Sequence, residues 1–147
     1  MRVCVVVPYD LAEEGGVKRH AVHVAAALRA VGDEVWIIGP SSTGGNHGAW
    51  VHGFAGVVNV PANGSDNYLG IFIRPWQVRS FMREHRFDVV HLHEPIQPSL
   101  SYYALWSSPE AAHICTFHAY VEDESRALRW SRARRSQRLR TSICRSR

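Results

Sequence analysis

The chain has 147 residues, of which 46% are hydrophobic and 20% charged, a composition typical of one soluble globular domain. No apolar run reaches the roughly 18–20 residues that span a bilayer, and the start of the chain lacks a signal-peptide pattern, so we expect a cytoplasmic protein. The formal net charge of +4 combines a body of charge −5 with nine arginines in residues 125–147, and this acidic body argues against a nucleic-acid-binding groove.

The first forty residues predict a strand, a helix and a second strand. Residues 2–7 form a continuous apolar run, typical of a strand that is buried on both faces. Apolar residues recur at helical spacing over residues 17–31, and Gly32 is the expected end of that helix. A strand at 34–38 completes a βαβ unit, whose crossover is expected to be right-handed.

The remainder of the body continues this alternation. We expect, in chain order, a Gly- and Ser-rich loop at 41–53, a strand at 54–60, a polar turn at 62–67, a helix at 73–84, a strand at 89–92, a helix at 98–107 and a strand at 113–117. The pattern predicts an α/β fold with a doubly wound, Rossmann-like parallel sheet. With about five strands visible, we expect an open sheet edge and a marginally stable or associating protein.

The composition changes near residue 122. We therefore predict a folded domain at 1–121 and an Arg-rich tail at 122–147. The tail has two interpretations, a disordered basic segment or an out-of-frame translation of a GC-rich gene, which yields Arg, Ser and Ala; we favour the second. The three cysteines, Cys4, Cys115 and Cys144, lack metal-ligand spacing, and the first two read as small buried hydrophobic residues.

Two glycines stand between the first strand and the first helix. Gly15 and Gly16 lie at the carboxyl end of a strand, where α/β sheets bind ligands. Paired glycines let backbone N–H groups approach an anion at a helix N-terminus. The loop lacks the G-x-G-x-x-G pattern of dinucleotide sites, and a glycine-rich turn without any ligand is an equal alternative.

Polar residues also follow two later strands. His91 and His93 share one face of a strand and could chelate a metal, but no third ligand lies nearby, so we predict no metal site. Glu94 and His118 each stand at a strand's carboxyl end. His118 could donate a hydrogen bond to a ligand oxygen or act as a general acid or base, although a structural role is the commoner one for such a histidine.

The helix expected at 73–84 carries a possible membrane surface. Trp76 lies near Arg79, Arg83 and Arg86, and the three arginines fall on one helical face. Such a helix can lie on an anionic lipid surface with its tryptophan at the interface. The alternative is an ordinary amphipathic helix that packs its apolar side on the sheet.

In this order and spacing, the motifs resemble the opening of retaining GT-B glycosyltransferases of family 4. The resemblance rests on Gly15-Gly16-Val17 followed by His20, on Gly32-Asp33-Glu34-Val35 where the family has Gly-His-Glu-Val, on Phe87 through Pro95, and on Thr116-Phe117-His118. Pro61 through Ser65 and His93 through Ser101 are similar to segments of the actinobacterial phosphatidylinositol mannosyltransferases. The match covers residues 1 to about 121, roughly a third of a typical member.

The resemblance implies the amino-terminal, acceptor-binding half of a GT-B fold. It implies GDP-mannose as donor and a phosphatidylinositol-type lipid as acceptor, at an anionic surface on the inner face of the cell membrane. By the same resemblance the site residues are His118 as catalytic residue, Gly15 and Gly16 for the donor diphosphate, Tyr9, Asn63, Ser65 and Glu94 for the acceptor, and Trp76, Arg79 and Arg83 for the membrane. No cofactor is expected on the protein, and any magnesium would accompany the diphosphate of the sugar nucleotide.

The second domain of that family has no counterpart in the sequence. Three functions remain open: a fragment of a mannosyltransferase, an enzyme completed by a second chain, and a non-catalytic module that binds an inositol lipid or a sugar nucleotide. Binding of nucleic acid through the arginine tail ranks last, since the tail has no aromatic interleaving beyond Trp130.

Overall fold

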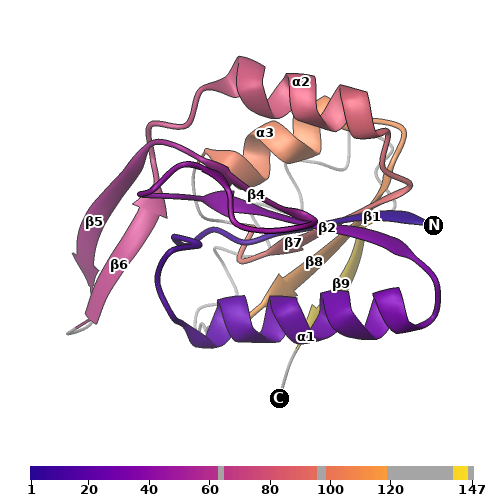
Figure 1. Cartoon of the computed structure of the whole chain (residues 1–147), viewed down its shortest axis with the longest axis horizontal. Coiled ribbons are helices and arrows are strands. Elements are labelled where there is room, and N and C mark those ends of the chain that lie inside the picture. Colours follow the sequence, from indigo (N-terminus) through magenta and orange to yellow (C-terminus); the bar gives the residue numbers. More distant parts are fainter. Residues whose placement is uncertain (63–64, 96–98, 119–140, 146–147) are drawn as a thin grey trace.

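The computed structural model describes residues 1–62, 65–95, 99–118 and 141–145, which build a sheet with helices on both faces (Figure 1). The elements are β1 (Arg2–Val6), α1 (Gly16–Ala30), β2 (Glu34–Pro40), β3 (Gly45–Asn46), β4 (Val51–Phe54), β5 (Val57–Ala62), β6 (Ser65–Gly70), α2 (Pro75–His85), β7 (Val89–His93), α3 (Leu100–Ser107), β8 (Ala112–Phe117) and β9 (Thr141–Arg145). This arrangement confirms the predicted Rossmann-like α/β class.

Seven of the nine described strands form the main sheet, in the order β3-β4-β2-β1-β7-β8-β9, and β5 and β6 form a separate pair. All neighbours pair in parallel except β3 and β4, which are antiparallel. From β1 the chain builds outward to β2 on one side, and later from β7 to β8 on the other. The order therefore reverses between β1 and β7, and in such sheets ligands bind outside the carboxyl ends of the strands at this switch point.

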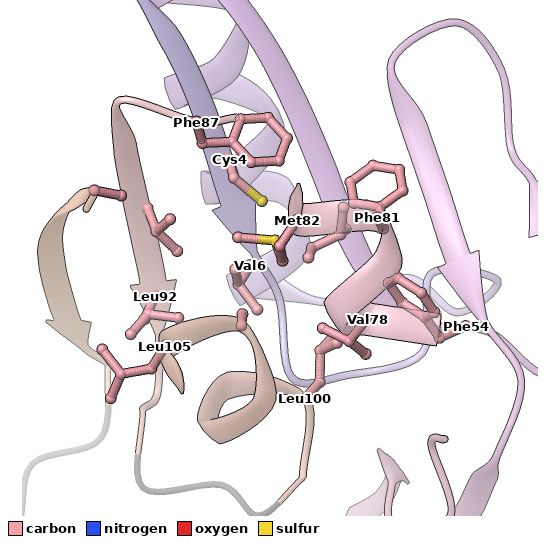
Figure 2. Packing of buried hydrophobic residues seen from close by; sticks show 14 of the residues in the cluster. Cys4, Val6, Phe54, Val78, Phe81, Met82, Phe87, Leu92, Leu100 and Leu105 are labelled. Carbon is pink, nitrogen blue, oxygen red and sulfur yellow. The ribbon is translucent and has the colours of Figure 1, made fainter. Parts of the chain in front are cut away.

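One face of the sheet is covered by α2 and α3 and holds the larger core. Figure 2 shows side chains from both helices meeting side chains of β1 and β7. Leu92, at 0% exposure, belongs to a cluster of sixteen buried residues, which also contains Cys4, Val6, Val78, Phe81, Met82, Leu100 and Leu105. Burying this apolar surface is the main term that stabilises the domain.

The opposite face is covered by α1 and holds a smaller core. Ala21 and Ala25 of α1 are fully buried against the valines of β1 and the residues Val35 and Ile37 of β2. Helix α1 ends as predicted, because Gly32 takes a φ of +93°, which glycine adopts without strain. Cys4 and Cys115 are buried, as predicted, and burial raises the pKa of the Cys4 thiol.

The strand predicted at 54–60 is wrong as a single element. The main-sheet strand β4 ends at Phe54, and β5 belongs to a separate hairpin with β6. The break lies at Gly56, where φ is +127° and an added Cβ would lie 2.5 Å from the backbone carbon of Phe72. The chain turns sharply there and sends the hairpin away from the sheet (Figure 1). Of the polar turn predicted at 62–67, Ala62 ends β5 and residues 65–67 belong to β6, whereas 63–64 lie outside the described residues.

The predicted tail is described only in part. Residues 141–145 form β9, which pairs in parallel with β8. The rest of the segment, 119–140 and 146–147, lies outside the described residues. The domain boundary at 121 and the expectation of marginal stability therefore stay predictions.

Candidate functional site

The predicted site residues of three strand ends lie at one edge of the sheet. Tyr9 follows β1, Glu94 follows β7 and His118 follows β8, and these three strands are consecutive neighbours in the sheet. The edge is the carboxyl edge at the switch point, so the fold brings together the groups that the sequence separates by more than a hundred residues.

The loop after β1 is tied to the β5–β6 hairpin. Tyr9, which is half-buried, forms an isolated antiparallel bridge with Leu69 of β6. The next residue, Asp10, donates its backbone N–H to the carbonyl oxygen of Tyr68 at 2.9 Å. The hairpin is therefore held against the loop that carries Tyr9, and its second strand begins at Ser65.

Asp10 is a site residue that the sequence reasoning missed. Its side chain is buried, and Oδ1 accepts hydrogen bonds from the backbone amides of Ala12 (2.9 Å) and Ser42 (3.0 Å). Burial raises the pKa of this carboxyl, but the hydrogen bonds from Ser42 and Ala12 outweigh burial, so the pKa lies below its ordinary value. Asp10 thus fixes the loop after β1 to the loop after β2. An acid in the loop that follows a buried strand was the available signal.

Gly15 and Gly16 stand at the N-terminus of α1. Gly15 is the N-cap in extended conformation, no side chain caps the helix, and Gly16 is its first residue. Both glycines are exposed, and a Cβ added to either would meet no atom within 4 Å. The protein itself does not require glycine here. The open space beside uncapped helix amides suits an anion that approaches the backbone closely.

Four histidines gather where β7 and β8 end beside the first turn of α1. His93 Nδ1 lies 2.8 Å from His118 Nε2, and the two rings stack with centroids 5.1 Å apart. His20 of α1 stands edge-on to both rings, with centroids 5.6 Å from His93 and 5.2 Å from His118. His91 tilts against His93 at 4.4 Å and hydrogen-bonds Thr116 Oγ1 through Nε2 at 2.8 Å. From the sequence, His20 was named only as part of a motif. Its place one helical turn after Gly16 was the signal that its side chain would lie near the strand ends.

Two of these histidines, His91 and His93, are uncharged at neutral pH because their pKa values lie well below it. Burial, followed by the neighbouring imidazoles, lowers the pKa of His93 to about 3 and that of His91 to about 4. Burial also lowers the pKa of His118, against the opposing effect of the Glu94 carboxylate. A neutral imidazole can donate one hydrogen bond and accept another, so at pH 7 this geometry favours hydrogen bonding by His118 over protonation of a ligand.

Glu94 connects the ends of β7 and β8. It is buried and takes a φ of +47°, and its backbone N–H donates to the carbonyl oxygen of Thr116 at 2.8 Å. Its Oε1 accepts a hydrogen bond from the backbone N–H of His118. At least one carboxylate oxygen of Glu94 therefore holds the backbone of His118. The predicted role of Glu94 in binding the acceptor substrate stays a prediction.

The structure describes the remaining predicted acceptor residues incompletely. Asn63 lies outside the described residues, and Ser65 is described only as the first residue of β6. Their roles stay predictions.

Helix α2 lies on the opposite face of the sheet from α1 (Figure 1). The predicted membrane residues Trp76, Arg79 and Arg83 are exposed on it. Trp76 is 65% exposed, and the guanidinium of Arg74 lies 5.9 Å from its ring centroid. Val78, Phe81 and Met82 of α2 are buried, so the apolar side of the helix packs toward the sheet, as in the alternative interpretation. Beside the exposed face runs a groove of about 1080 Å³, lined among others by Trp76, Arg79, Arg83, Arg86, Phe87, Tyr103 and Trp106.

Neither a metal centre nor a membrane span is found in the described part of the chain. No group of three or more His, Cys, Asp or Glu side chains there is arranged to hold a metal ion. Within the same ranges, no helix is both long and apolar enough to cross a membrane.

The chain is similar to known glycosyltransferases. The family model described as Glycosyltransferase Family 4 matches residues 14–147. Curated relatives include the phosphatidyl-myo-inositol mannosyltransferases of Mycobacterium leprae (34% identical), Mycolicibacterium smegmatis (36%) and Propionibacterium freudenreichii (34%). The alignments cover 80%, 80% and 89% of this chain and 32%, 31% and 36% of the respective relatives, so the chain spans about a third of their length.

Proposed function

The chain belongs to glycosyltransferase family 4, and from that premise we propose that it forms the acceptor-side half of a retaining mannosyltransferase. The reaction transfers mannose from GDP-mannose to a phosphatidylinositol-type lipid. The observation that carries the proposal is the convergence of Tyr9, the start of α1 and the His93–His118 pair at the switch-point edge. A transferase must hold two substrates in one geometry, and this edge offers groups suited to both.

The donor diphosphate fits the N-terminus of α1. Gly15 and Gly16 leave open space beside uncapped amides, and the helix dipole favours negative charge there. Negative charge grows on the diphosphate as the sugar departs, so N–H groups aimed at it stabilise the transition state more than the ground state. The residues of this chain need no bound cofactor for that role, and any Mg²⁺ would enter on the diphosphate itself.

The acceptor head group is proposed to bind beside Tyr9 and the β5–β6 hairpin. The aromatic ring offers an apolar face to the inositol ring, and Asn63, Ser65 and Glu94 are proposed to bind its hydroxyl and phosphate groups. The Tyr9–Leu69 bridge supports this placement, because it fixes the hairpin beside the loop.

With a lipid as the proposed acceptor, the enzyme is proposed to act at the inner face of the cell membrane. The exposed Trp76 beside Arg79 and Arg83 supports peripheral binding to anionic lipid, with the tryptophan at the interface. The protein would then be cytoplasmic and attached reversibly through α2.

A chimeric enzyme tests the proposal. Residues 1–118 of this chain replace the corresponding part of the Mycolicibacterium smegmatis relative, and transfer of labelled mannose from GDP-mannose to phosphatidylinositol vesicles is measured. We expect transfer by the chimera, a loss of at least tenfold on Tyr9→Ala, and a loss of about a hundredfold on His118→Ala, the size of one positioned transition-state contact.

The outcome separates the proposal from its alternatives. A folded chimera that binds phosphatidylinositol vesicles without any transfer would favour a non-catalytic inositol-lipid module. Transfer by the unmodified 147-residue chain alone would contradict the proposal that the chain supplies only the acceptor-side half of the enzyme. Transfer that appears only when a separate donor-domain chain is added would support an enzyme completed in trans.

A further inference from the structure

The contact between His93 and His118 permits only one donor. The two nitrogens, His93 Nδ1 and His118 Nε2, lie 2.8 Å apart, which is a hydrogen-bond distance. Both imidazoles are neutral at pH 7, because burial lowers both pKa values. Each ring therefore carries one proton, and a single proton occupies the contact.

The surroundings of His93 decide which ring donates. His93 is fully buried, and its Nε2 has no hydrogen-bond partner among the described residues. If His118 donated, the proton of His93 would sit on that Nε2 as a buried N–H for which the described residues offer no acceptor. If His93 donates through Nδ1, its Nε2 is a bare lone pair. Buried donors without partners are rarer than under-satisfied acceptors, so the second arrangement is favoured.

From this geometry we propose that His93 is a positioning residue that holds His118 as the Nδ1–H tautomer. With Nε2 occupied by His93, the nitrogen that His118 offers to a ligand is Nδ1, and it offers a donor to an oxygen atom. The inference rests on the proposed function, which places His118 at the transferred sugar. Sugar hydroxyls and phosphate oxygens both accept such a hydrogen bond.

The remaining neighbours hold this arrangement in place. The Glu94 carboxylate accepts from the backbone N–H of His118, so the main chain of His118 is fixed as well as its ring. His20 of α1 packs edge-on against both rings. The hydrogen bond made by one ring nitrogen determines which tautomer the other presents, and His93 makes that bond here.

Nitrogen-15 NMR of the 147-residue chain tests the inference without any substrate. Long-range ¹H–¹⁵N correlation spectra at pH 7.5 distinguish a protonated ring nitrogen from a bare one, and His118→Phe identifies the signals of His118. We expect a protonated Nδ1 and a bare Nε2 in the unmodified chain. In a free histidine the opposite tautomer, Nε2–H, predominates, so the expected result does not arise by default.

Three variants sharpen the test. In His93→Phe the ring volume stays but the donor is lost, and His118 should shift to a mixture in which Nε2–H predominates. His93→Asn carries an amide that can donate in place of Nδ1, and should restore the Nδ1–H form. His91→Phe, on the same face of β7 but bonded to Thr116, is the matched control and should leave the His118 tautomer unchanged.

The inference is overturned if His118 of the unmodified chain carries its proton on Nε2, whatever the variants do. It is also overturned if His93→Phe, folded by circular dichroism, retains the Nδ1–H form. Should that variant not fold, the unmodified chain and His93→Asn still decide. The transfer assay on the chimera fails or succeeds separately, so an inactive chimera with the expected tautomer contradicts the proposed function and leaves the histidine pair standing.

Discussion

Strand β7 turns its side chains toward two different environments, and the contrast divides the molecule. Val90 and Leu92 enter the large apolar core under α2 and α3, and both are fully buried. On the other face, Val89 packs against the small core under α1, while His91 and His93 continue the same row as a polar cluster. One five-residue strand thus contributes both to the stability of the fold and to the site.

The difference shows where each kind of packing ends. Under α2 and α3 the apolar contacts run from β1 to α3 without interruption (Figure 2). Under α1 the apolar contacts are fewer and give way to imidazoles toward the carboxyl edge of the sheet. Buried imidazoles contribute less to folding than aliphatic groups, because their desolvation offsets much of their contacts. We therefore expect this face to contribute less to the stability of the fold than the face under α2 and α3.

The largest effect should come from neighbouring substitutions on β7. Leu92→Ala removes a fully buried side chain and should lower the free energy of unfolding by about 2–5 kcal/mol. His91→Ala should lower it by about 1 kcal/mol, the usual net value of one hydrogen bond. Urea unfolding of both variants measures the two losses. Equal losses would contradict the division between the two faces.

Two glycines offer the next comparison. Gly56→Ala should destabilise the fold by more than about 2 kcal/mol, because it combines an unfavourable φ of +127° with a clash against the backbone of Phe72. Gly16→Ala, exposed and unobstructed at the start of α1, should change stability by less than about 1 kcal/mol. Thermal or urea unfolding of both variants measures this. A large loss for Gly16→Ala would indicate a structural role for that glycine and weaken its assignment to the diphosphate.

Acid should act on the α1 face. His91 and His93 have folded-state pKa values of about 4 and about 3, against an ordinary value of 6.5. Each binds fewer protons in the folded chain than in the unfolded chain, so stability falls as the pH drops below about 6.5 toward 4. The slope is at most about 1.4 kcal/mol per pH unit for each histidine.

Urea unfolding across pH 4.5–7.5 measures this slope. The double variant His91→Phe/His93→Phe should make it shallower, since it removes these two groups. A profile that stays equally steep in the folded double variant would place the responsible groups elsewhere.

The smallest effect concerns the exposed sides of the two helix layers. Arg79→Glu on α2 should weaken binding to vesicles with anionic lipid by about 1–2 kcal/mol, roughly five- to thirtyfold. Arg19→Glu makes the same charge change on the exposed surface of α1 and serves as the control. Co-sedimentation with vesicles at two salt concentrations compares them. Equal losses would mean that net charge, and not the α2 surface, governs binding.

Much of the fold could be predicted from the sequence because local patterns agree with it. The apolar run of β1, the periodicity of α1 and the stop at Gly32 each encode their element without tertiary help. The break at Gly56 could not be predicted in this way. It depends on the approach of Phe72, sixteen residues later, and such a contact leaves no periodic signal in the sequence.

The sequence predicts where the site residues lie along the chain, but it does not predict which side chains contact one another. Strand ends marked Tyr9, Glu94 and His118, because parallel strands bring their carboxyl ends to one edge. That His93 bonds His118, and that Asp10 bonds the loop after β2, follows from the register of β7 and β8 and from the path of a loop, neither of which the local sequence determines.

Because Cys4 is buried, the reactivity of its thiol can be used to measure how often the sheet opens. Its thiol lies at the centre of the sheet with 0% exposure, so reagents cannot reach it in the folded chain. Burial also raises the pKa of the thiol, which lowers the amount of reactive thiolate. With Cys144 replaced by serine, the described thiols, Cys4 and Cys115, are both buried. A maleimide pulse would then label the chain only when the sheet separates, and the labelling rate would record how often that happens under native conditions.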